Sequence, residues 1–282
     1  MSKIERKNKV LGVEISNTNR IVYPKLKITK LDIANYYKSI SKYILPFLGN
    51  RPISVIRCHD SINKNIFFKK HAMPSEDVKR IKIGKAQEYF YINNKTQLIK
   101  QTQMGTIEFH TWASNINNIN SPDIMVFDLD PDIKMPLNKL QQAVLTLKKV
   151  LDDLGLKSFL KTSGGKGYHI LIPFKNIKNY KKFNEFALKI AIYLENNYDI
   201  FTTNIRKENR KNKIFIDYLR NKKGATCVCP FSLRARENAP ISMPIPWDKI
   251  TNIKPNQITI KNYKQYLTNC WQNFFKVEQT IN

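Results

Sequence analysis

Three aspartates at alternating positions form the most chemically informative stretch of the sequence. In DIMVFDLDPD, Asp128, Asp130 and Asp132 follow an apolar run. Residues two apart along a strand share a face and lie roughly 6.5–7 Å apart, so Asp128 and Asp130 should point the same way. Asp132 follows Pro131 and is expected in the turn. Two carboxylates this close repel unless a cation lies between them, and oxygen ligands favour Mg²⁺ or Mn²⁺.

A third acid strengthens the prediction of a metal centre. The stretch FIDYLRN places Asp217 after a β-branched and aromatic run, so in a sheet it could lie beside the other two acids. Three carboxylates around two metal ions suit nucleotidyl transfer. One ion activates a 3′ hydroxyl, and the other holds the triphosphate and the leaving group.

Other interpretations of the acidic run are weaker or remain open. An EF-hand loop counted from Asp128 fails, because Ile133 stands where glycine is needed and Lys139 where glutamate is needed. A solvated turn with acids near the start of the helix after Pro136 is a second interpretation. Sugar-nucleotide transferases also use D-x-D to hold a metal and a diphosphate, and this spacing alone does not exclude them.

The glycine-rich stretch KTSGGKGYHI (161–170) is the second candidate for chemistry. Its three glycines allow a tight turn and close approach to a ligand. Ser163 and the loop amides could donate to phosphate, Lys166 adds a mobile cation, and His169 lies on the returning strand. The spacing is not that of a P-loop. A plain hairpin turn with a lysine at its tip is the alternative.

Two further stretches could bind phosphate. SLRAR places Arg234 and Arg236 on one face if the chain is extended there, where two guanidinium groups suit a triphosphate or a DNA backbone. His110 lies at the end of the predicted strand TIEFHTW and could contact phosphate or act as a general acid. Taken alone, a single histidine is more often structural.

The composition favours a polyanionic partner. The chain has 282 residues, 42% of them apolar, and a formal net charge of +26, which points to DNA, RNA or an anionic membrane face. No signal peptide or apolar run of membrane-span length is evident, so a reduced, cytoplasmic protein is expected. Cys227 and Cys229 lack a second metal-binding half and are expected to be buried thiols alternating along a strand.

Hydrophobic periodicity predicts a mixed α/β (α+β) fold with a central sheet. Thr29 should cap a helix that ends near Pro46. Strands are predicted at 52–57, 65–70, 86–92, 106–112, 123–130, 157–162, 168–173 and 213–219, and helices at 96–103, 137–154, 180–198 and from about Ile260.

Several motifs in fixed order carry a family resemblance. NRIVYP, RPISVIRC, FFKKH, EFHTWAS, VFDLDPD, KTSGGKGYH, FIDYLRNKKGAT and SLRAREN occur in this order between about Val13 and Ile250. The chain closely resembles the polymerase domain of the bacterial ATP-dependent DNA ligase D. That domain belongs to the archaeo-eukaryotic primase superfamily and works in non-homologous end joining. Motif order and basic charge then disfavour the glycosyltransferase interpretation.

The resemblance implies a primase-type catalytic core, with central mixed or antiparallel sheets flanked by helices. One primase-polymerase domain over 1–282 is expected. Within it we expect a loose basic lead-in (1–15), an N-terminal lobe with a 5′-phosphate pocket (16–112), a catalytic core (113–250) and a helical tail (251–282).

The resemblance also assigns roles to individual residues. Asp128, Asp130 and Asp217 match the metal-binding, catalytic triad, and the nucleotide pocket comprises His110, Ser163, Lys166, His169 and Arg234. Asn17, Arg20 and Lys30 match the pocket for the 5′-phosphate of the downstream strand, and Phe67 and Phe68 match aromatics that stack on DNA bases. Arg20 stands where the family often has lysine, which replaces a compact ammonium by a planar fork.

Simpler interpretations accompany the DNA-binding residues. Lys30 could be a surface lysine in the first helical turn, a position that the helix dipole disfavours and that a bound anion would favour. Phe67 and Phe68 could both be core aromatics. Because neighbouring strand residues face opposite ways, one should lie in the core and the other should be free to stack.

The expected function is template-directed addition of NTPs or dNTPs at 5′-phosphorylated DNA breaks or gaps, with two Mn²⁺ or Mg²⁺ ions. Expected partners are double-stranded DNA ends, Ku and a separate ATP-dependent DNA ligase, in a cytoplasmic, nucleoid-associated location and without a membrane. No ligase module is expected, because the nearest match to the nucleophilic K-x-D-G motif, at 30–33, lacks the glycine. The alternatives are a de novo primase of a mobile element and a non-catalytic module that bridges DNA ends.

Overall fold

The computed structural model describes residues 8–73, 76–84 and 87–281. The chain divides into two compact units. Unit 1 comprises Met1–Thr111 and Val228–Pro240, and unit 2 comprises Trp112–Cys227 and Ile241–Asn282. Sheets and four α-helices occur in the described part of the chain, which confirms the mixed α/β class.

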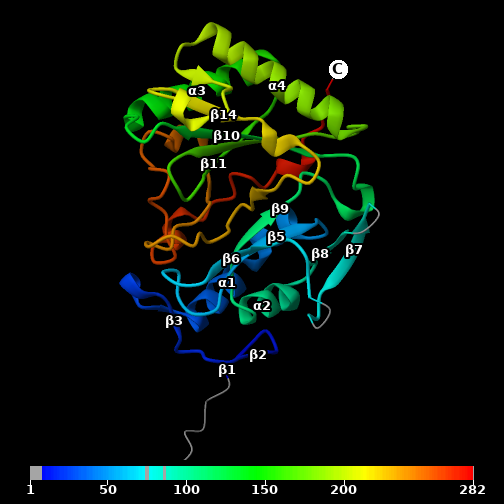
Figure 1. Ribbon diagram of the computed structural model, residues 1–282, viewed down its shortest axis with the longest axis vertical. Helices are drawn as coiled ribbons and strands as arrows, with labels where there is room; N and C mark the ends of the chain where they lie inside the picture. The colour runs from blue at the N-terminus through cyan, green and yellow to red at the C-terminus, as the bar shows by residue number, and fades with distance from the viewer. Residues whose placement is uncertain (1–7, 74–75, 85–86, 282) are drawn as a thin grey trace, which may run out of the picture. The chain divides into compact units, whose positions relative to one another are not determined.

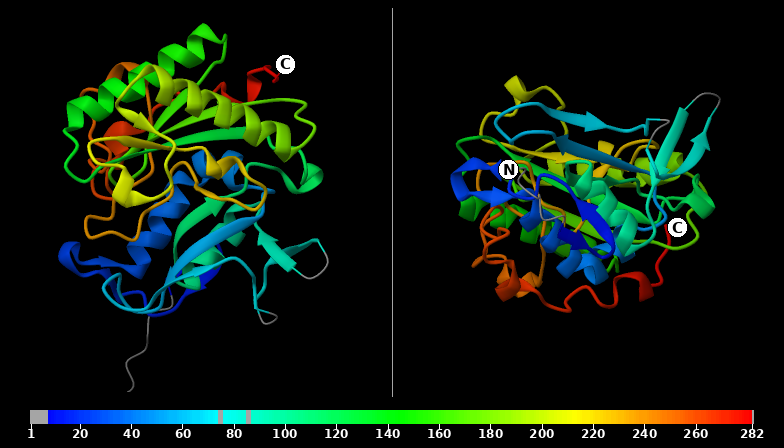
Figure 2. Two further views of the ribbon diagram at one scale, coloured as in Figure 1. Left: turned by 45° about the horizontal axis from the view of Figure 1, so that its top comes forward. Right: turned by 90° about the horizontal axis from the view of Figure 1, so that it is seen from below.

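Unit 1 is built on an antiparallel sheet with two helices (Figures 1 and 2). The strand order is β15 (Cys227–Val228), β9 (Thr106–Thr111), β5 (Ile53–Cys58), β8 (Gln87–Tyr91) and β7 (Lys79–Ile83), with β6 (Ile66–Lys69) also paired to β5. Two small hairpins, β1 (Asn8–Val10) with β2 (Val13–Ile15) and β3 (Ile21–Tyr23) with β4 (Ile28–Thr29), precede the helices α1 (Lys30–Leu48) and α2 (Lys95–Gln103).

Local chemistry explains where α1 begins and how it packs. The Thr29 backbone N–H donates to Asp32 Oδ2 at 2.8 Å, and the Asp32 N–H donates to Thr29 Oγ1 at 3.2 Å, so the predicted cap is confirmed as a capping box. On the buried face, the Tyr37 hydroxyl donates to the Ile107 carbonyl of β9. Its ring meets the edge of Phe109. These contacts hold α1 against the sheet of unit 1.

Unit 2 carries a six-stranded sheet with helices over one face (Figures 1 and 2). The order is β13 (Phe201–Thr202), β14 (Ile214–Asp217), β10 (Ile124–Pro131), β12 (Tyr168–Pro173), β11 (Phe159–Thr162) and β16 (Pro244–Ile245). All pairs are antiparallel except β13–β14. The helices α3 (Leu137–Asp153) and α4 (Tyr180–Asn197) bury their apolar stripes.

The register of β10 positions the acidic residues. Asp128 is the Cα partner of His169 on β12 and of Asp217 on β14. Beyond that point β14 ends, and the side chain of Asn221 continues the hydrogen bonding to β10. Asn221 Oδ1 accepts from the Val126 N–H, and Asn221 Nδ2 donates to the Val126 carbonyl, both at 2.8 Å. The fully buried Asn221 amide therefore replaces one residue of a neighbouring strand.

Three expectations about organisation need correction. Residues 1–7 lie outside the described part, but residues 8–15 form the β1–β2 hairpin rather than a loose lead-in, because Val10 and Ile15 are buried. Residues 228–240 belong to unit 1, whereas the sequence places them in the catalytic core. The strand expected at 213–219 ends at Asp217, where the short turn η4 (Leu219–Asn221) begins.

The tail forms no α-helix in its described residues, only the short turns η6 (Tyr263–Tyr266) and η7 (Phe274–Lys276). Polar side chains compete for the backbone here: Asn262 Oδ1 accepts from the Thr259 N–H, as asparagine does in turns. The apolar spacing that predicts a helix instead serves an aromatic cluster, in which Trp271 and Phe274 pack against Phe159 of β11.

Replacement of Asn221 by alanine should destabilise the protein by about 1–3 kcal/mol, because the Val126 N–H and C=O would be buried without their partner. Urea unfolding followed by circular dichroism measures the change. Asn120→Ala is the matched control, since the Asn120 side chain is exposed and accepts a hydrogen bond from Lys223 Nζ. Its effect should stay within about 0.5 kcal/mol. Equal losses in the two variants would contradict the role given to Asn221.

Candidate functional site

The acidic cluster of unit 2 lies where β10 and β14 run side by side. Asp128 and Asp217 are 8% and 9% exposed, and their Cα atoms are register partners. His169 Nε2 lies 3.1 Å from Asp128 Oδ1. Arg220 Nε lies 3.0 Å from Asp217 Oδ2 and 3.7 Å from Asp128 Oδ2. Two cationic or protonatable groups therefore contact the buried carboxylates.

The surroundings shift the pKa values of the three acids in different directions. Burial would raise the pKa of Asp128, but the imidazole of His169 and the charge of Arg220 hold it far below its usual value. Partial burial and the charge of Asp128 raise the pKa of Asp130. Burial also raises the pKa of Asp217 against the opposing charge of Arg220. The surroundings therefore favour the ionised form of Asp128 more strongly than that of Asp130 or Asp217.

The donor chemistry of the three acids fits a hard divalent cation, because all their donor atoms are carboxylate oxygens. Within residues 8–73, 76–84 and 87–281, however, no three His, Cys, Asp or Glu side chains are gathered closely enough to hold one ion. The guanidinium of Arg220 supplies countercharge to Asp128 and Asp217 in this structure. Asp132 lies in the turn after β10, where its side chain accepts from the Asn212 N–H.

The glycine-rich loop is a closed turn between β11 and β12. Ser163 Oγ accepts hydrogen bonds from the N–H groups of Gly165 at 3.0 Å and Gly167 at 3.2 Å, and the Gly164 N–H donates to the Pro255 carbonyl. These three amides, expected to donate to phosphate, are bonded within the protein. A Cβ at Gly167 would lie 2.1 Å from the Leu129 carbonyl oxygen, so only glycine fits. Lys166 at the tip is exposed.

His169 joins the acidic cluster to a second group of side chains in unit 2. Its Nδ1 atom lies 2.8 Å from Lys161 Nζ and 3.3 Å from Cys227 Sγ. Burial would lower the pKa of His169, but the carboxylate of Asp128 raises it. Because Lys161 and His169 are register partners on β11 and β12, the sheet itself brings the ammonium to the imidazole. Cys227 is partly exposed, whereas the sequence predicts a buried thiol there.

In unit 1, a buried glutamate links two predicted nucleotide-binding residues. Glu108 Oε2 lies 2.9 Å from His110 Nε2 and 2.9 Å from Arg234 Nε, and Glu108 Oε1 accepts from the Ala235 N–H. Burial would raise the pKa of Glu108, but these partners lower it to about 2. The charged carboxylate therefore fixes the orientation of both His110 and Arg234.

The two phenylalanines of β6 differ in exposure. Phe68 is 50% exposed, its ring edge faces His110 with centroids 6.0 Å apart, and Lys70 Nζ lies over it at 5.6 Å. Phe67 is half-buried against His59. Phe68 is thus exposed at the surface as expected, but Phe67 is not a core residue, because among the described strands β6 pairs only with β5.

Asn17, Arg20 and Lys30 of unit 1 are linked by backbone hydrogen bonds. The Arg20 N–H donates to the Asn17 carbonyl, and the Lys30 N–H donates to the Arg20 carbonyl. Lys30 is 4% exposed and is therefore not a surface lysine. Its ammonium donates to Gln103 Oε1 at 2.8 Å. Burial, together with the charge of Arg20, lowers the pKa of Lys30 to about 8.

Arg20 adds a second sign of an anion site. Its Nε atom is buried and has no hydrogen-bond partner among the described residues. A guanidinium N–H without a partner beside a buried ammonium is costly, and an anion would satisfy both groups. Burial of the Lys30 ammonium and of Arg20 Nε is therefore not expected to stabilise the fold by itself.

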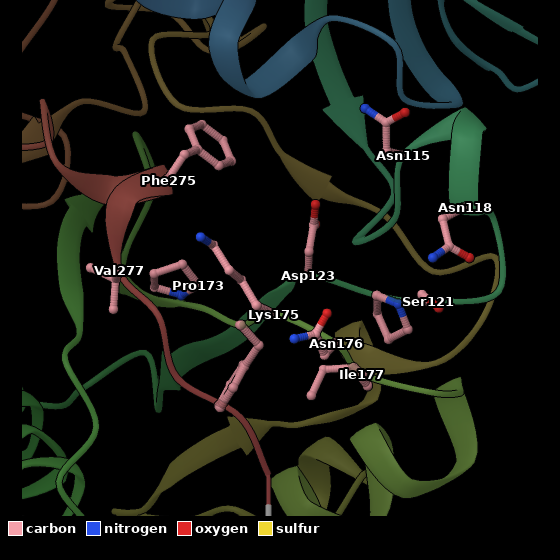
Figure 3. A pocket seen from close by; sticks show the side chains of 12 residues that line it. Asn115, Asn118, Ser121, Asp123, Pro173, Lys175, Asn176, Ile177, Phe275 and Val277 are labelled. Carbon is pink, nitrogen blue, oxygen red and sulfur yellow. The ribbon is translucent and has the colours of Figure 1, made fainter.

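A separate pocket of unit 2 opens at the other end of β10 and β12 (Figure 3). It encloses about 300 Å³, and its lining includes Asn115, Asp123, Lys175 and Phe275. Asp123 precedes β10, so it lies about 17 Å along the strand from Asp128. With a single carboxylate in its lining, this pocket does not contain the predicted metal ligands.

Comparison with known proteins identifies the family. Residues 29–274 match the family described as LigD, primase-polymerase domain. The chain belongs to the LigD primase-polymerase family. It is 35% identical over 263 residues to the multifunctional non-homologous end joining protein LigD of Pseudomonas aeruginosa, covering 91% of this chain and 31% of that protein. It is 31% identical over 252 residues to the bifunctional non-homologous end joining protein LigD of Bacillus subtilis, covering 88% of this chain and 41% of that protein.

The fold of the LigD primase-polymerase domain is also found among solved structures. The polymerase domain of Mycobacterium tuberculosis ligase D, in complex with DNA, superposes with a TM-score of 0.81 at 24% identity, covering 88% of this chain and 92% of that one. The chain spans only 31% and 41% of the two curated LigD relatives. No α-helix in the described part of the chain is both long and apolar enough to cross a membrane.

Several residues contact the predicted site, but the sequence motifs do not predict a role for them. Glu108 sits two residues before His110 on one strand face, Arg220 sits three after Asp217, and Lys161 opens the glycine-rich motif. Their spacing could have identified them. Gln103, whose side chain bonds Lys30 and Ser16, carries no such signal, because it is 73 residues from Lys30.

Lys30 generates a pH-dependent prediction. Its pKa is depressed from 10.5 to about 8 in the folded protein, so the folded state binds fewer protons than the unfolded state between these values. The cost of the charged form is fully present below pH 8 and is relieved as the pH rises. The free energy of unfolding of the wild type minus that of Lys30→Met should therefore increase between pH 8 and 10. Urea unfolding across this range measures it, with exposed Lys64→Met as control. A flat difference would contradict the depressed pKa.

Proposed function

We propose that this LigD domain is a template-directed nucleotidyltransferase that binds 5′-phosphorylated DNA breaks or gaps and adds NTPs or dNTPs during non-homologous end joining. The observation that carries the proposal is the register of Asp128 opposite Asp217 on neighbouring strands, with Asp130 two residues further along β10. The names of the relatives place them in end joining, and the net charge of +26 suits a DNA-binding protein.

Asp128, Asp130 and Asp217 would hold two Mg²⁺ or Mn²⁺ ions, which when bound supply charge stabilisation and activation of a 3′ hydroxyl. The contacts of the chain support a division of labour among the acids. Asp128, kept ionised by His169 and Arg220, is ready to bind a cation at neutral pH. Burial raises the pKa values of Asp130 and Asp217, and a nearby cation would lower them again.

Each unit by itself carries side chains suited to contact the phosphates of a nucleotide. In unit 2, Lys166 supplies an exposed cation on a turn fixed by Ser163, and His169 lies beside Asp128. In unit 1, Glu108 orients His110 and Arg234, whose roles follow from the family resemblance. Arg234 with its fixed Nε contact suits a planar, bidentate interaction with phosphate oxygens.

Recognition of the break would combine an anion site and a stacking surface. Arg20 and Lys30 form the 5′-phosphate site, supported by the unpartnered Arg20 Nε and the buried Lys30 ammonium. The exposed ring of Phe68 provides a stacking surface for an unpaired base, which tolerates any sequence. The Mycobacterium tuberculosis domain is described as a complex with DNA, in agreement with this proposal. Ku and an ATP-dependent DNA ligase are the proposed partners, in the cytoplasm at the nucleoid.

The test is nucleotide incorporation on a short gapped duplex with Mn²⁺ or Mg²⁺, comparing a downstream 5′-phosphate with a 5′-hydroxyl. Asp128→Asn should lower incorporation at least about 100-fold, because a buried carboxylate is lost. Lys30→Met should remove most of the stimulation by the 5′-phosphate, roughly tenfold, while leaving incorporation on the 5′-hydroxyl substrate. Incorporation that is indifferent to the phosphate would favour a general primase. DNA binding without incorporation would favour the end-bridging module.

Phe68→Ala should weaken binding to DNA with a single-stranded overhang by about 1–3 kcal/mol, the cost of one lost base stack. Fluorescence anisotropy with a labelled overhang measures the affinity. Phe67→Ala is the matched control on the same strand, because its ring packs against His59 instead of lying exposed. A larger loss of affinity in Phe67→Ala than in Phe68→Ala would contradict the assignment of base stacking to Phe68.

A further inference from the structure

The pocket at the far end of β10 and β12 has an apolar floor and a polar rim (Figure 3). Its volume of about 300 Å³ lies at the lower end of the range typical of small-molecule sites. Phe174 and Ile177 of the floor are 2% and 5% exposed, whereas Phe275 at the opening is 41% exposed. All of the lining residues belong to unit 2. The pocket is therefore a site of this unit by itself.

Hydrogen bonds fix the chain segments that line the pocket. Before β10, the Asp123 N–H donates to the Ala113 carbonyl at 2.9 Å. After β12, the Lys175 N–H donates to the Gln279 carbonyl at 2.9 Å, and Gln279 Nε2 donates to the Pro173 carbonyl at 2.7 Å. Because these segments are already bonded, little further ordering is needed when a ligand binds.

The polar groups of the rim form a balanced set in a strongly basic chain. Asp123 and Lys175 carry opposite charges, and Lys175 forms an ion pair with Glu278. The other polar lining residues are neutral amides and one alcohol, namely Asn115, Asn118, Ser121 and Asn176. A lining of this kind suits a neutral group with hydrogen-bond donors and acceptors along its edge, unlike the excess of cations in a chain of net charge +26.

A flat heteroaromatic ring matches these groups. The exposed ring of Phe275 offers a surface for stacking. Asn115 Oδ1 accepts from the Asn117 N–H at 3.0 Å, so its amide presents Nδ2 as a donor, and the carboxylate of Asp123 is an acceptor. Figure 3 shows the side chain of Asp123 extending between Phe275 and Asn115. An aromatic face with a donor and an acceptor beside it is the means by which proteins bind unpaired bases.

We propose that this pocket binds one unpaired nucleobase that carries an exocyclic amino group, as cytosine, adenine and guanine do. A carboxylate such as that of Asp123 accepts a hydrogen bond from the amino group of cytosine. Thymine has no amino group, and its single N–H lies between two carbonyl oxygens that a carboxylate would repel. Two exposed lysines that follow lining residues in the sequence, Lys178 and Lys276, are suited to contact the phosphates beside the bound base.

This nucleobase site goes beyond the proposed catalysis and does not depend on it, because Asp123 lies about 17 Å along the strand from Asp128. A base of this chemistry can belong to a single strand or to a free nucleotide. The net charge of +26 favours the single strand, because neighbouring phosphates add to the affinity.

The first experiment locates the base on the wild-type chain. A short 5′-hydroxyl oligo(dC) that carries 5-iodocytosine is bound without divalent ions and irradiated, and the crosslinked peptides are identified by mass spectrometry. Because photoactivated iodopyrimidines react mainly with aromatic side chains in contact, the peptide that contains Phe275 should be crosslinked. Loss of this crosslink with excess dCMP would identify free nucleotides as ligands of the pocket, and its persistence would identify a base within a strand. Absence of a crosslink to the pocket peptides would overturn the proposal.

The second experiment tests the base preference by fluorescence anisotropy, again without divalent ions. The wild type should bind oligo(dC) roughly fivefold more tightly than oligo(dT) of the same length, and Asp123→Asn should abolish this preference. Asp199→Asn is the matched control, because it removes an exposed carboxylate elsewhere in unit 2 and changes the net charge equally. A ratio of affinities that is the same in Asp123→Asn and the wild type would contradict the role of Asp123.

The third comparison separates base contacts from phosphate contacts. Phe275→Ala, checked for folding by circular dichroism, should weaken binding to oligo(dC) roughly fivefold and leave binding to an abasic strand of equal length unchanged, because only the bases stack. Tyr193→Ala, which removes another half-exposed aromatic ring of unit 2, should bind both strands as the wild type does. Equal losses of affinity for the two strands in Phe275→Ala would show that Phe275 does not contact a base.

Discussion

The structure of unit 2 depends on placing like charges opposite each other in the middle of a sheet. Asp128 and Asp217 are both buried, and neighbouring strands hold them in register. Such a pair is unfavourable by itself, since each carboxylate penalises ionisation of the other. His169 from β12 and Arg220 from the turn after β14 offset the repulsion. The sheet order, the short turn η4 and the bonded Asn221 amide all serve to keep these groups in contact.

In unit 1, positive charges instead of negative ones are placed close together away from solvent. Lys30 is buried close to Arg20, while Glu108 contacts both His110 and Arg234. A protein with net charge +26 gains little stability from concentrating more cations in its interior. The proposed phosphate-bearing ligands would account for both clusters of unit 1, as is common where function and stability conflict.

Motifs in the sequence predict much of the site because strand periodicity and short spacing are local properties. The pairing of Asp128 with Asp217 followed from two apolar strands that each end in an acid. The burial of Lys30 did not follow, because it depends on the distant Gln103 and on a turn at Asn17 that only the folded chain forms. The loop amides were predicted to face phosphate, but Ser163 Oγ competes for them at shorter range. The tail has helical spacing, yet Trp271 and Phe274 find a tertiary partner in Phe159.

The closed turn at Ser163 has a further consequence for the kinetics of ligand exchange. Its amides are already bonded, and a Cβ at Gly167 would clash with the Leu129 carbonyl oxygen. A segment this constrained has little conformational entropy left to lose when a ligand arrives. In the proposed function, such a turn would recognise a ligand by its existing shape and not by closing around it. Poorly matched ligands would then differ from well-matched ones mainly in their faster dissociation.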